Sequence, residues 1–186
     1  MQRSSAVSSY GVVFGPFTQN SHYNVSDVVS LNCHNNCGLG DFNGDGQIDM
    51  SSAQYKASDS LYEQGAVRFY LGPLSGVYEN GDEDFSLRGA YPDERFGFRQ
   101  YNIGDIDADG SDDLMVNHYS DTYTLLFYGP LTQDIESSAY DARFSGGYLD
   151  WYSGPFGGGS YSLGDLNNDG FGDFVTGSYR FLGEAL

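Results

Sequence analysis

Three stretches of the chain repeat one arrangement of polar residues, in which an aspartate or asparagine occupies every second position. They read LGDFNGDGQIDM at residues 39–50, IGDIDADGSDDL at 103–114 and LGDLNNDGFGDF at 163–174. In each stretch a glycine follows the alternating residues, and a further aspartate comes three positions later. Side chains at alternate positions of a tightly curled loop can point inward together, and the glycine allows the sharp turn. Because Ca²⁺ takes six to eight oxygen ligands at about 2.3–2.6 Å, the pattern predicts calcium-binding loops.

Each loop offers five predicted ligands: the side chains at positions one, three, five and nine and the backbone carbonyl at position seven. In the order of the loops they are Asp41, Asn43, Asp45, Gln47 and Asp49; Asp105, Asp107, Asp109, Ser111 and Asp113; and Asp165, Asn167, Asp169, Phe171 and Asp173. Without a cation these carboxylates would repel one another. A polar turn without an ion is the alternative for a single copy. Three copies in register favour about three Ca²⁺ per chain.

Two other landmarks recur with the loops, which indicates a chain built of repeats. Gly-Asp pairs begin at residues 40, 104 and 164, and Gly-Pro pairs begin at residues 15, 72 and 129. Phe-Gly pairs begin at residues 96 and 156. Segments rich in strand formers lie between these landmarks, such as GAVRFYLGP, TYTLLFYGP and DLMVNHY, and weaker ones are DFSLRG and YDARFSG. Four strands in about sixty residues, repeated, are typical of a propeller blade, so we predict an all-β propeller of four-stranded blades.

The predicted repeat units divide the chain, residues 1–186, into three blade equivalents of a single module. They span about residues 27–90, 91–146 and 147–186, and residues 1–26 complete the last unit, because residues 11–16 have the pattern of a third strand. The last blade would thus be shared between the C-terminal and N-terminal strands. Known propellers typically use four to eight blades. Two alternatives therefore stay open: a homodimer that closes a six-bladed ring, or a piece of a larger propeller.

The composition excludes several classes of partner. The chain has 26 acidic and 8 Lys and Arg residues, for a net charge of −18, which argues against nucleic acid and anionic membrane surfaces. It has no run of eighteen apolar residues, so we expect no membrane span. The first residues lack the apolar core and cleavage site of a secretory signal. A high glycine content, 26 residues, and 16% aromatics suit short strands joined by tight turns.

The combination of Phe-Gly, then Gly-Asp-x-(Asp/Asn)-x-Asp-Gly-x-x-Asp, then a strand ending near Gly-Pro resembles the FG-GAP repeat of integrin α-subunit β-propellers. The resemblance covers essentially the whole chain, and FYLGPLSG and DIDADGSDDL look closer to bacterial integrin-like surface proteins than to animal integrins. It implies that each acidic loop joins the first two strands of a blade and binds calcium. It also implies a place outside the cell or on its surface, in adhesion or recognition of a protein or glycan. Two features depart from the family: Asn32-Cys33 replaces the first Phe-Gly, and three blades fall short of the usual seven.

The two cysteines, Cys33 and Cys37 in CHNNC, leave three alternatives open. They could form a local disulfide, remain free thiols, or hold zinc together with His34 or His22. The sequence shows no complete set of four zinc ligands. The disulfide is the first expectation.

The sequence offers one candidate carbohydrate site and no recognisable active site. Tyr148, Trp151 and Tyr152 lie in a glycine-rich stretch, where they would either stack on sugar rings, as in a lectin, or pack between blades. No histidine has a serine or cysteine partner in a recognisable catalytic arrangement, and calcium would keep the densest carboxylates ionised. We therefore expect no enzymatic activity. A structural spacer in a larger surface protein is the remaining alternative.

Overall fold

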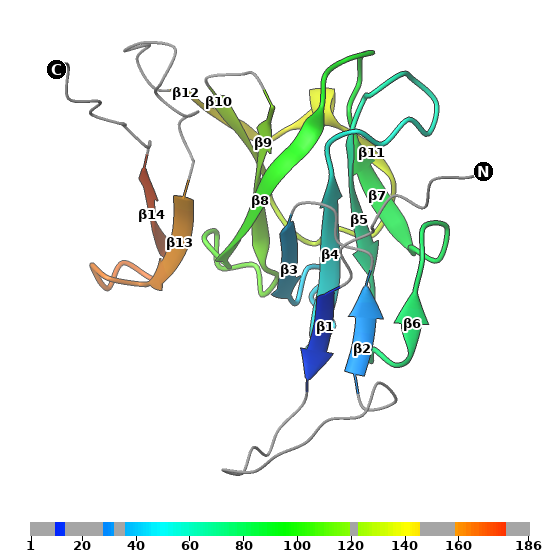
Figure 1. The fold of residues 1–186 in the computed structure, drawn as a ribbon. Coiled ribbons are helices and arrows are strands. Elements are labelled where there is room, and N and C mark those ends of the chain that lie inside the picture. Colours follow the sequence, from blue (N-terminus) through cyan, green and yellow to red (C-terminus); the bar gives the residue numbers. More distant parts are fainter. Residues whose placement is uncertain (1–9, 14–27, 32–35, 120–122, 146–158, 178–186) are drawn as a thin grey trace, which may run out of the picture.

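The chain forms an all-β structure of four separate sheets (Figure 1). The computed structural model describes residues 10–13, 28–31, 36–119, 123–145 and 159–177. Within these ranges the only helical element is a short 3₁₀ turn, η2 (Ser137–Ala139). Nothing in them is a helix of the length and apolarity that crossing a membrane requires.

Two sheets each contain four consecutive antiparallel strands. The central sheet contains β3 (Asn36–Gly40), β4 (Asp49–Gln54), β5 (Ala66–Tyr70) and β7 (Phe85–Arg88), and β11 (Ile135–Glu136) adds to β7 in parallel. The second sheet contains β8 (Phe96–Gly104), β9 (Asp113–His118), β10 (Tyr123–Phe127) and β12 (Ala142–Ser145). Five of these strands, β5, β7, β9, β10 and β12, lie in segments that the sequence analysis singles out as strand-forming.

The other two sheets each resemble half of such a unit. β1 (Tyr10–Val13) pairs antiparallel with β2 (Val28–Leu31), and β2 pairs in parallel with the short β6 (Val77–Tyr78). This repeats the relation of β5, β7 and β11, so β1 and β2 correspond to third and fourth strands. β13 (Gly159–Gly164) and β14 (Asp173–Gly177) pair with each other and correspond to first and second strands.

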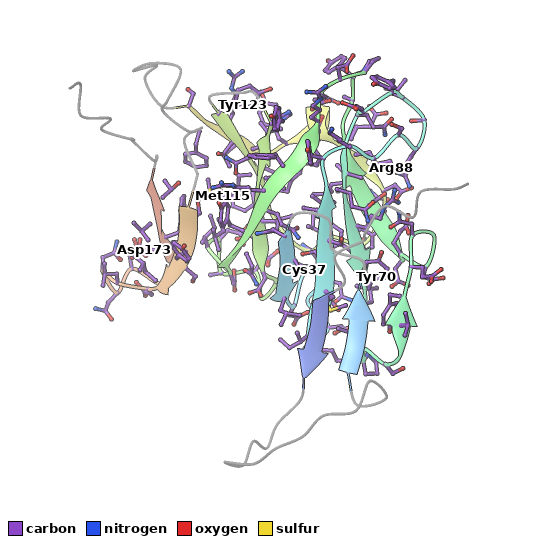
Figure 2. All side chains as sticks on the ribbon, viewed as in Figure 1. Cys37, Tyr70, Arg88, Met115, Tyr123 and Asp173 are labelled. Atoms are coloured by element: carbon purple, nitrogen blue, oxygen red, sulfur yellow. The ribbon has the colours of Figure 1, made fainter. Side chains whose placement is uncertain are left out.

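The central and second sheets pack against each other through the main hydrophobic core. The buried residues of this core are Phe42, Ala53, Val67, Phe69, Phe85, Leu87, Phe96, Leu114, Val116, Leu125, Phe127 and Leu131. All residues of β4, β5 and β9 are buried, because these strands are covered on both faces. A smaller cluster, which includes Met115 (labelled in Figure 2), joins the second sheet to β14 through the rings of Phe144 and Phe174, 5.7 Å apart.

The first strands of successive units are neighbours. β8 contacts β3 on one side and β13 on the other. Asn36 Nδ2 donates to the Gln100 carbonyl at 3.0 Å, and Asn102 Nδ2 donates to the Leu39 carbonyl at 2.7 Å. These side chains tie the first strands together where the edges of two different sheets meet.

The all-β class is confirmed, and the strands form several separate sheets. None of the sheets closes on itself, and among the described residues β14 has β13 as its only partner strand, so the propeller and its number of blades stay predictions. The predicted unit boundaries also stay predictions. β2 falls inside the predicted unit 27–90 yet pairs with β1.

Candidate metal-binding loops

The three acidic segments occupy equivalent places, each between the first and second strands of a unit. The first acidic loop (residues 41–49) joins β3 to β4, the second (105–113) joins β8 to β9, and the third (165–173) joins β13 to β14. All three lie at the same end of the structure, and Asp173, labelled in Figure 2, marks the end of the third. The sequence therefore predicts the position of the loops in the fold correctly.

The first aspartate of each loop organises the turn. In the second loop, Asp105 accepts the N–H groups of Asp109 at 3.1 Å and Gly110 at 3.0 Å through its two oxygens. The same pair of bonds recurs at Asp41, from Asp45 and Gly46, and at Asp165, from Asp169 and Gly170. One sequence pattern thus produces one hydrogen-bond network three times.

The residues at positions three and five complete this network. The Asp107 carboxylate accepts the Asp109 N–H at 3.2 Å, and Asp109 accepts the Ser111 N–H at 2.8 Å. Asn43 and Asn167 take the place of Asp107 in the other loops and accept the equivalent N–H groups through Oδ1. Positions four and six have positive φ, for example +64° at Ala108 and +96° at Gly110, and this curls the backbone around the polar side chains.

The second loop brings three carboxylates close enough to share a cation. Oxygens of Asp105, Asp107 and Asp109 all lie within 4.8 Å of one another. Two oxygens that bind one Ca²⁺ at about 2.3–2.6 Å can be at most about 5 Å apart, so the spacing fits a common ion. In the first and third loops an asparagine carbonyl oxygen would replace the middle carboxylate, which suits the same hard cation.

The aspartates at position nine hold the loops in a second way. Asp113 is fully buried and accepts the N–H groups of Ile106 and Gly129, both at 2.8 Å. Asp49 is equally buried and accepts the N–H groups of Phe42 at 3.0 Å and Gly72 at 2.9 Å. Each of these aspartates therefore connects its acidic loop to the Gly-Pro pair that follows the third strand of the same unit.

Burial and neighbouring charge disfavour the ionised form of these carboxyls. Burial raises the pKa of Asp113 to about 6, and the carboxylates of Asp107 and Asp109 add to the increase, while the two backbone N–H groups oppose it. Burial also raises the pKa of Asp49. A cation at the loop would reverse this effect, because it favours the ionised form.

The ligand assignments at positions seven and nine stay predictions. The only cluster of acidic ligand atoms found within the described residues comprises Asp105, Asp107 and Asp109, without Asp113. At position seven, the N–H groups of Gln47, Ser111 and Phe171 donate to the aspartate two residues earlier. This arrangement leaves the predicted carbonyl ligands untested.

One acidic residue that the sequence does not single out joins two loops. Asp112 accepts the Asp41 N–H at 3.1 Å and the Asn102 side chain at 2.7 Å, and its own N–H donates to the Asp41 carbonyl at 2.8 Å. Ile48 and Gly172 hold the same position in the other loops, so the repeat gives no signal for this contact. The first loop is therefore held against the second.

Most of the other predicted site residues lie outside the described residues. Cys37 lies in β3, while Cys33 lies outside the described residues, so the disulfide stays a prediction. Tyr148, Trp151 and Tyr152, the expected sugar-stacking aromatics, also lie outside the described residues.

The chain is similar in sequence to an integrin α chain. No family model matches the chain. The chain is 27% identical over 178 residues to integrin alpha-PS2 of Drosophila melanogaster, and the match covers 86% of this chain. It covers 12% of the length of that relative. Together with the all-β structure, this similarity indicates an integrin-like fold.

Proposed function

We propose that the chain is a calcium-binding FG-GAP module of an integrin-like β-propeller, which acts in adhesion or recognition outside the cell or on its surface. The observation that carries the proposal is the network around Asp41, Asp105 and Asp165, which is the same in all three loops. A turn without function has no reason to retain four acidic or amide side chains three times. The similarity to an integrin α chain supports the adhesive role.

The mechanism is structural. Calcium would neutralise the crowded carboxylates at positions one, three and five, since a hard cation binds their oxygens. The chain itself transmits this order: Asp112 ties the first loop to the second, and Asp49 and Asp113 tie loops to Gly-Pro turns. An ordered loop thus fixes the relation between two strands of its own sheet and between two neighbouring sheets.

The two half units support the proposal of a propeller. β13 and β14 provide first and second strands, and β1 and β2 provide third and fourth strands. An antiparallel third strand on β14 would complete that blade. We propose that a second copy of the chain or further repeats of a longer protein supply it. Two chains would then close a six-bladed ring.

Native mass spectrometry in calcium tests both parts, because one spectrum counts chains and ions. We expect about three Ca²⁺ per chain. Asp107→Ala should remove one ion and leave the others bound. Glu136→Gln, which also removes one negative charge but lies in β11, should remove none. Loops that bind no calcium, or equal ion counts in the two variants, would contradict the proposal.

The role itself is recognition and not catalysis, since the densest carboxylates are assigned to calcium and stay ionised there. An adhesive module that binds a protein surface should do so equally well in the presence of free sugars. A lectin should be inhibited by them. Binding to a candidate protein ligand, measured with and without competing monosaccharides, distinguishes these two forms of recognition.

A further inference from the structure

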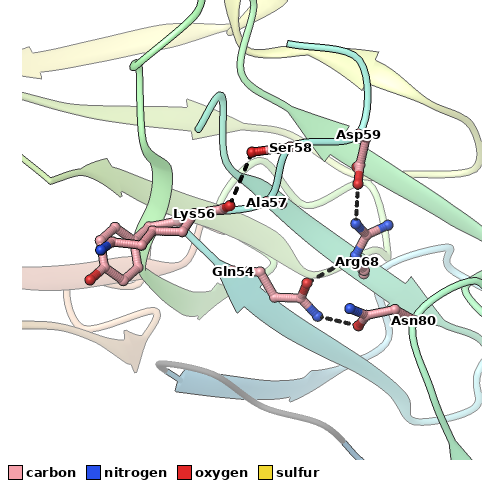
Figure 3. Close-up of a pocket in the computed structure, with 8 residues that line it drawn as sticks. Gln54, Lys56, Ala57, Ser58, Asp59, Arg68 and Asn80 are labelled. Atoms are coloured by element: carbon pink, nitrogen blue, oxygen red, sulfur yellow. Dashed lines mark hydrogen bonds and ion pairs between the residues drawn. The ribbon is translucent and has the colours of Figure 1, made fainter. Parts of the chain in front are cut away.

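A polar pocket lies at the end of the central sheet opposite the acidic loops (Figure 3). The first loop ends at Asp49, where β4 begins, and the pocket starts at Gln54, where β4 ends. At about 3.3 Å per residue, these two points are roughly 17 Å apart. The pocket has a volume of about 460 Å³, and its walls include Gln54, Tyr55, Lys56, Asp59, Arg68 and Asn80. It is therefore a site separate from the calcium loops.

A buried guanidinium forms the floor of this pocket. The Arg68 side chain is only 6% exposed and pairs with Asp59 at 2.5 Å and with Glu83. Its Nε donates to Gln54 Oε1 at 3.2 Å, and Gln54 Nε2 donates to Asn80 Oδ1 at 2.7 Å. Because two carboxylates already bind the guanidinium, it is not available to bind an anionic ligand, but it fixes the polar groups around it.

The pocket presents both donors and acceptors to a ligand. The Asn80 amide nitrogen has no hydrogen-bond acceptor among the described residues, and the Lys56 ammonium has no ion-pair partner among them. The Asp59 carboxylate offers acceptor oxygens. Among the lining residues Lys56 and Arg68 are positive and Asp59 is negative. The Glu83 carboxylate does not line the pocket but pairs with Arg68, so it offsets the second positive charge. A neutral ligand would meet no electrostatic barrier here.

A rigid aromatic wall borders the pocket. The Tyr55 ring stacks on Tyr119, with centroids 5.4 Å apart, and meets the Phe98 ring edge-on at 5.5 Å. The Lys56 ammonium lies 5.5 Å from the centroid of the Tyr55 ring. Two rings, those of Phe98 and Tyr119, thus hold Tyr55 in place beside the hydrogen-bonding groups.

We propose that this pocket binds a neutral saccharide, with its hydroxyl groups bonded to Asn80, Lys56 and Asp59 and its ring against Tyr55. A hydroxyl group both donates and accepts, so a sugar satisfies the mixed set of groups that a purely anionic or cationic ligand would leave unpaired. An acidic peptide would be repelled by the Asp59 carboxylate, the one negative group that lines the pocket. The volume is adequate for a ligand of one or two sugar rings. The site adds a ligand class to the proposed recognition function and does not depend on calcium.

Saturation-transfer NMR with the methyl glycosides of glucose, galactose, mannose and N-acetylglucosamine tests the proposal. At least one should bind, in the millimolar range expected of so small a ligand. Asn80→Ala and Lys56→Gln should each weaken that binding at least about fivefold. Arg143→Gln is the matched control, since the Arg143 guanidinium also lies over a tyrosine ring, at 3.9 Å from the Tyr123 centroid, but outside the pocket. It should leave binding unchanged.

Two results would overturn the proposal: no binding by any of the four glycosides, or equal binding by wild type and both pocket variants. Binding of polyglutamate in place of the glycosides would also overturn it, in favour of an acidic protein partner. Each titration is run in calcium and in chelator, with the fold followed by circular dichroism. A folded protein that binds the sugar but no calcium would refute only the calcium proposal, and the reverse result would refute only this one.

Discussion

The second residue of each acidic loop offers a graded test of how the loops are anchored. This position is hydrophobic in all three copies, but its burial differs: Phe42 is fully buried, Ile106 is half-buried and Leu166 is 71% exposed. Phe42 belongs to the main core and its ring meets Phe69 edge-on, with centroids 5.2 Å apart. The same repeat position should therefore contribute very differently to stability in the three loops.

The expected magnitudes follow from this burial. Phe42→Ala should lower the free energy of unfolding by about 3–5 kcal/mol, because a fully buried aromatic ring is lost and a cavity remains. Ile106→Ala should lower it by about 1–2 kcal/mol, since only part of the side chain is removed from water. Leu166→Ala should change it by less than about 0.5 kcal/mol. The backbone bonds of Phe42 to Asp49 and Leu131 remain in the variant, so the side chain alone is tested.

Urea denaturation in chelator, at low protein concentration, measures the three values without contributions from metal or self-association. The order Phe42, Ile106, Leu166 is the essential result. A loss below about 1 kcal/mol at Phe42, or a loss at Leu166 that equals it, would refute the reasoning from burial. Far-UV circular dichroism of each variant checks that the sheets are retained.

Three further outcomes are expected. Ala108 has a φ of +64°, which strains a residue with a β-carbon. Ala108→Gly should therefore raise the free energy of unfolding, measured in urea, by about 0.5 kcal/mol. The control Ala66→Gly, inside β5, should lower it by about 1 kcal/mol. Asp112→Ala should lower the free energy of unfolding by about 2 kcal/mol, because it removes the acceptor of the Asp41 N–H. Native mass spectrometry of this variant should count as many calcium ions as in wild type. Burial raises the pKa of Tyr70 to about 12. As pH rises above 10, the unfolded chain therefore releases the tyrosine proton before the folded chain does, and the free energy of unfolding falls. Urea melts at pH 9 and 11 should show a loss about 1.4 kcal/mol larger for wild type than for Tyr70→Phe.

Much of the fold could be predicted because each strand carries its own local signal. The Gly-Pro pairs at 72 and 129 follow β5 and β10, and the alternation in residues 114–119 marks β9. The two-residue strands β6 and β11 could not be predicted, since they are too short to show a pattern. Their parallel pairing with β2 and β7 is decided by how neighbouring units meet, which no local segment encodes.

In the candidate metal site, too, some features have a local sequence signal and others do not. Positions one, three and five of the loops could be predicted, because spacing alone places their side chains on the inside of a turn. The hydrogen bond from the Gly129 N–H to the Asp113 carboxylate could not be predicted. The two residues are 16 positions apart, one in the acidic loop and the other in the Gly-Pro pair. The pocket at Gln54 and Arg68 carried no signal, because its residues come from three separate segments and occur in one unit only.

The bonds of Asp49 and Asp113 give a physical reason for the joint recurrence of the Gly-Asp and Gly-Pro landmarks. In two units the buried carboxylate at position nine accepts one N–H from the acidic loop and one from the glycine of the Gly-Pro pair. If either landmark were lost, a buried charged group would lack half of its partners, which is a large penalty. The base of the loop therefore needs both motifs together, whether or not an ion is bound. Among the predicted side-chain ligands only position three varies between the copies, as Asn43, Asp107 and Asn167, and either side-chain oxygen suits a hard cation. Position nine is aspartate in all three copies.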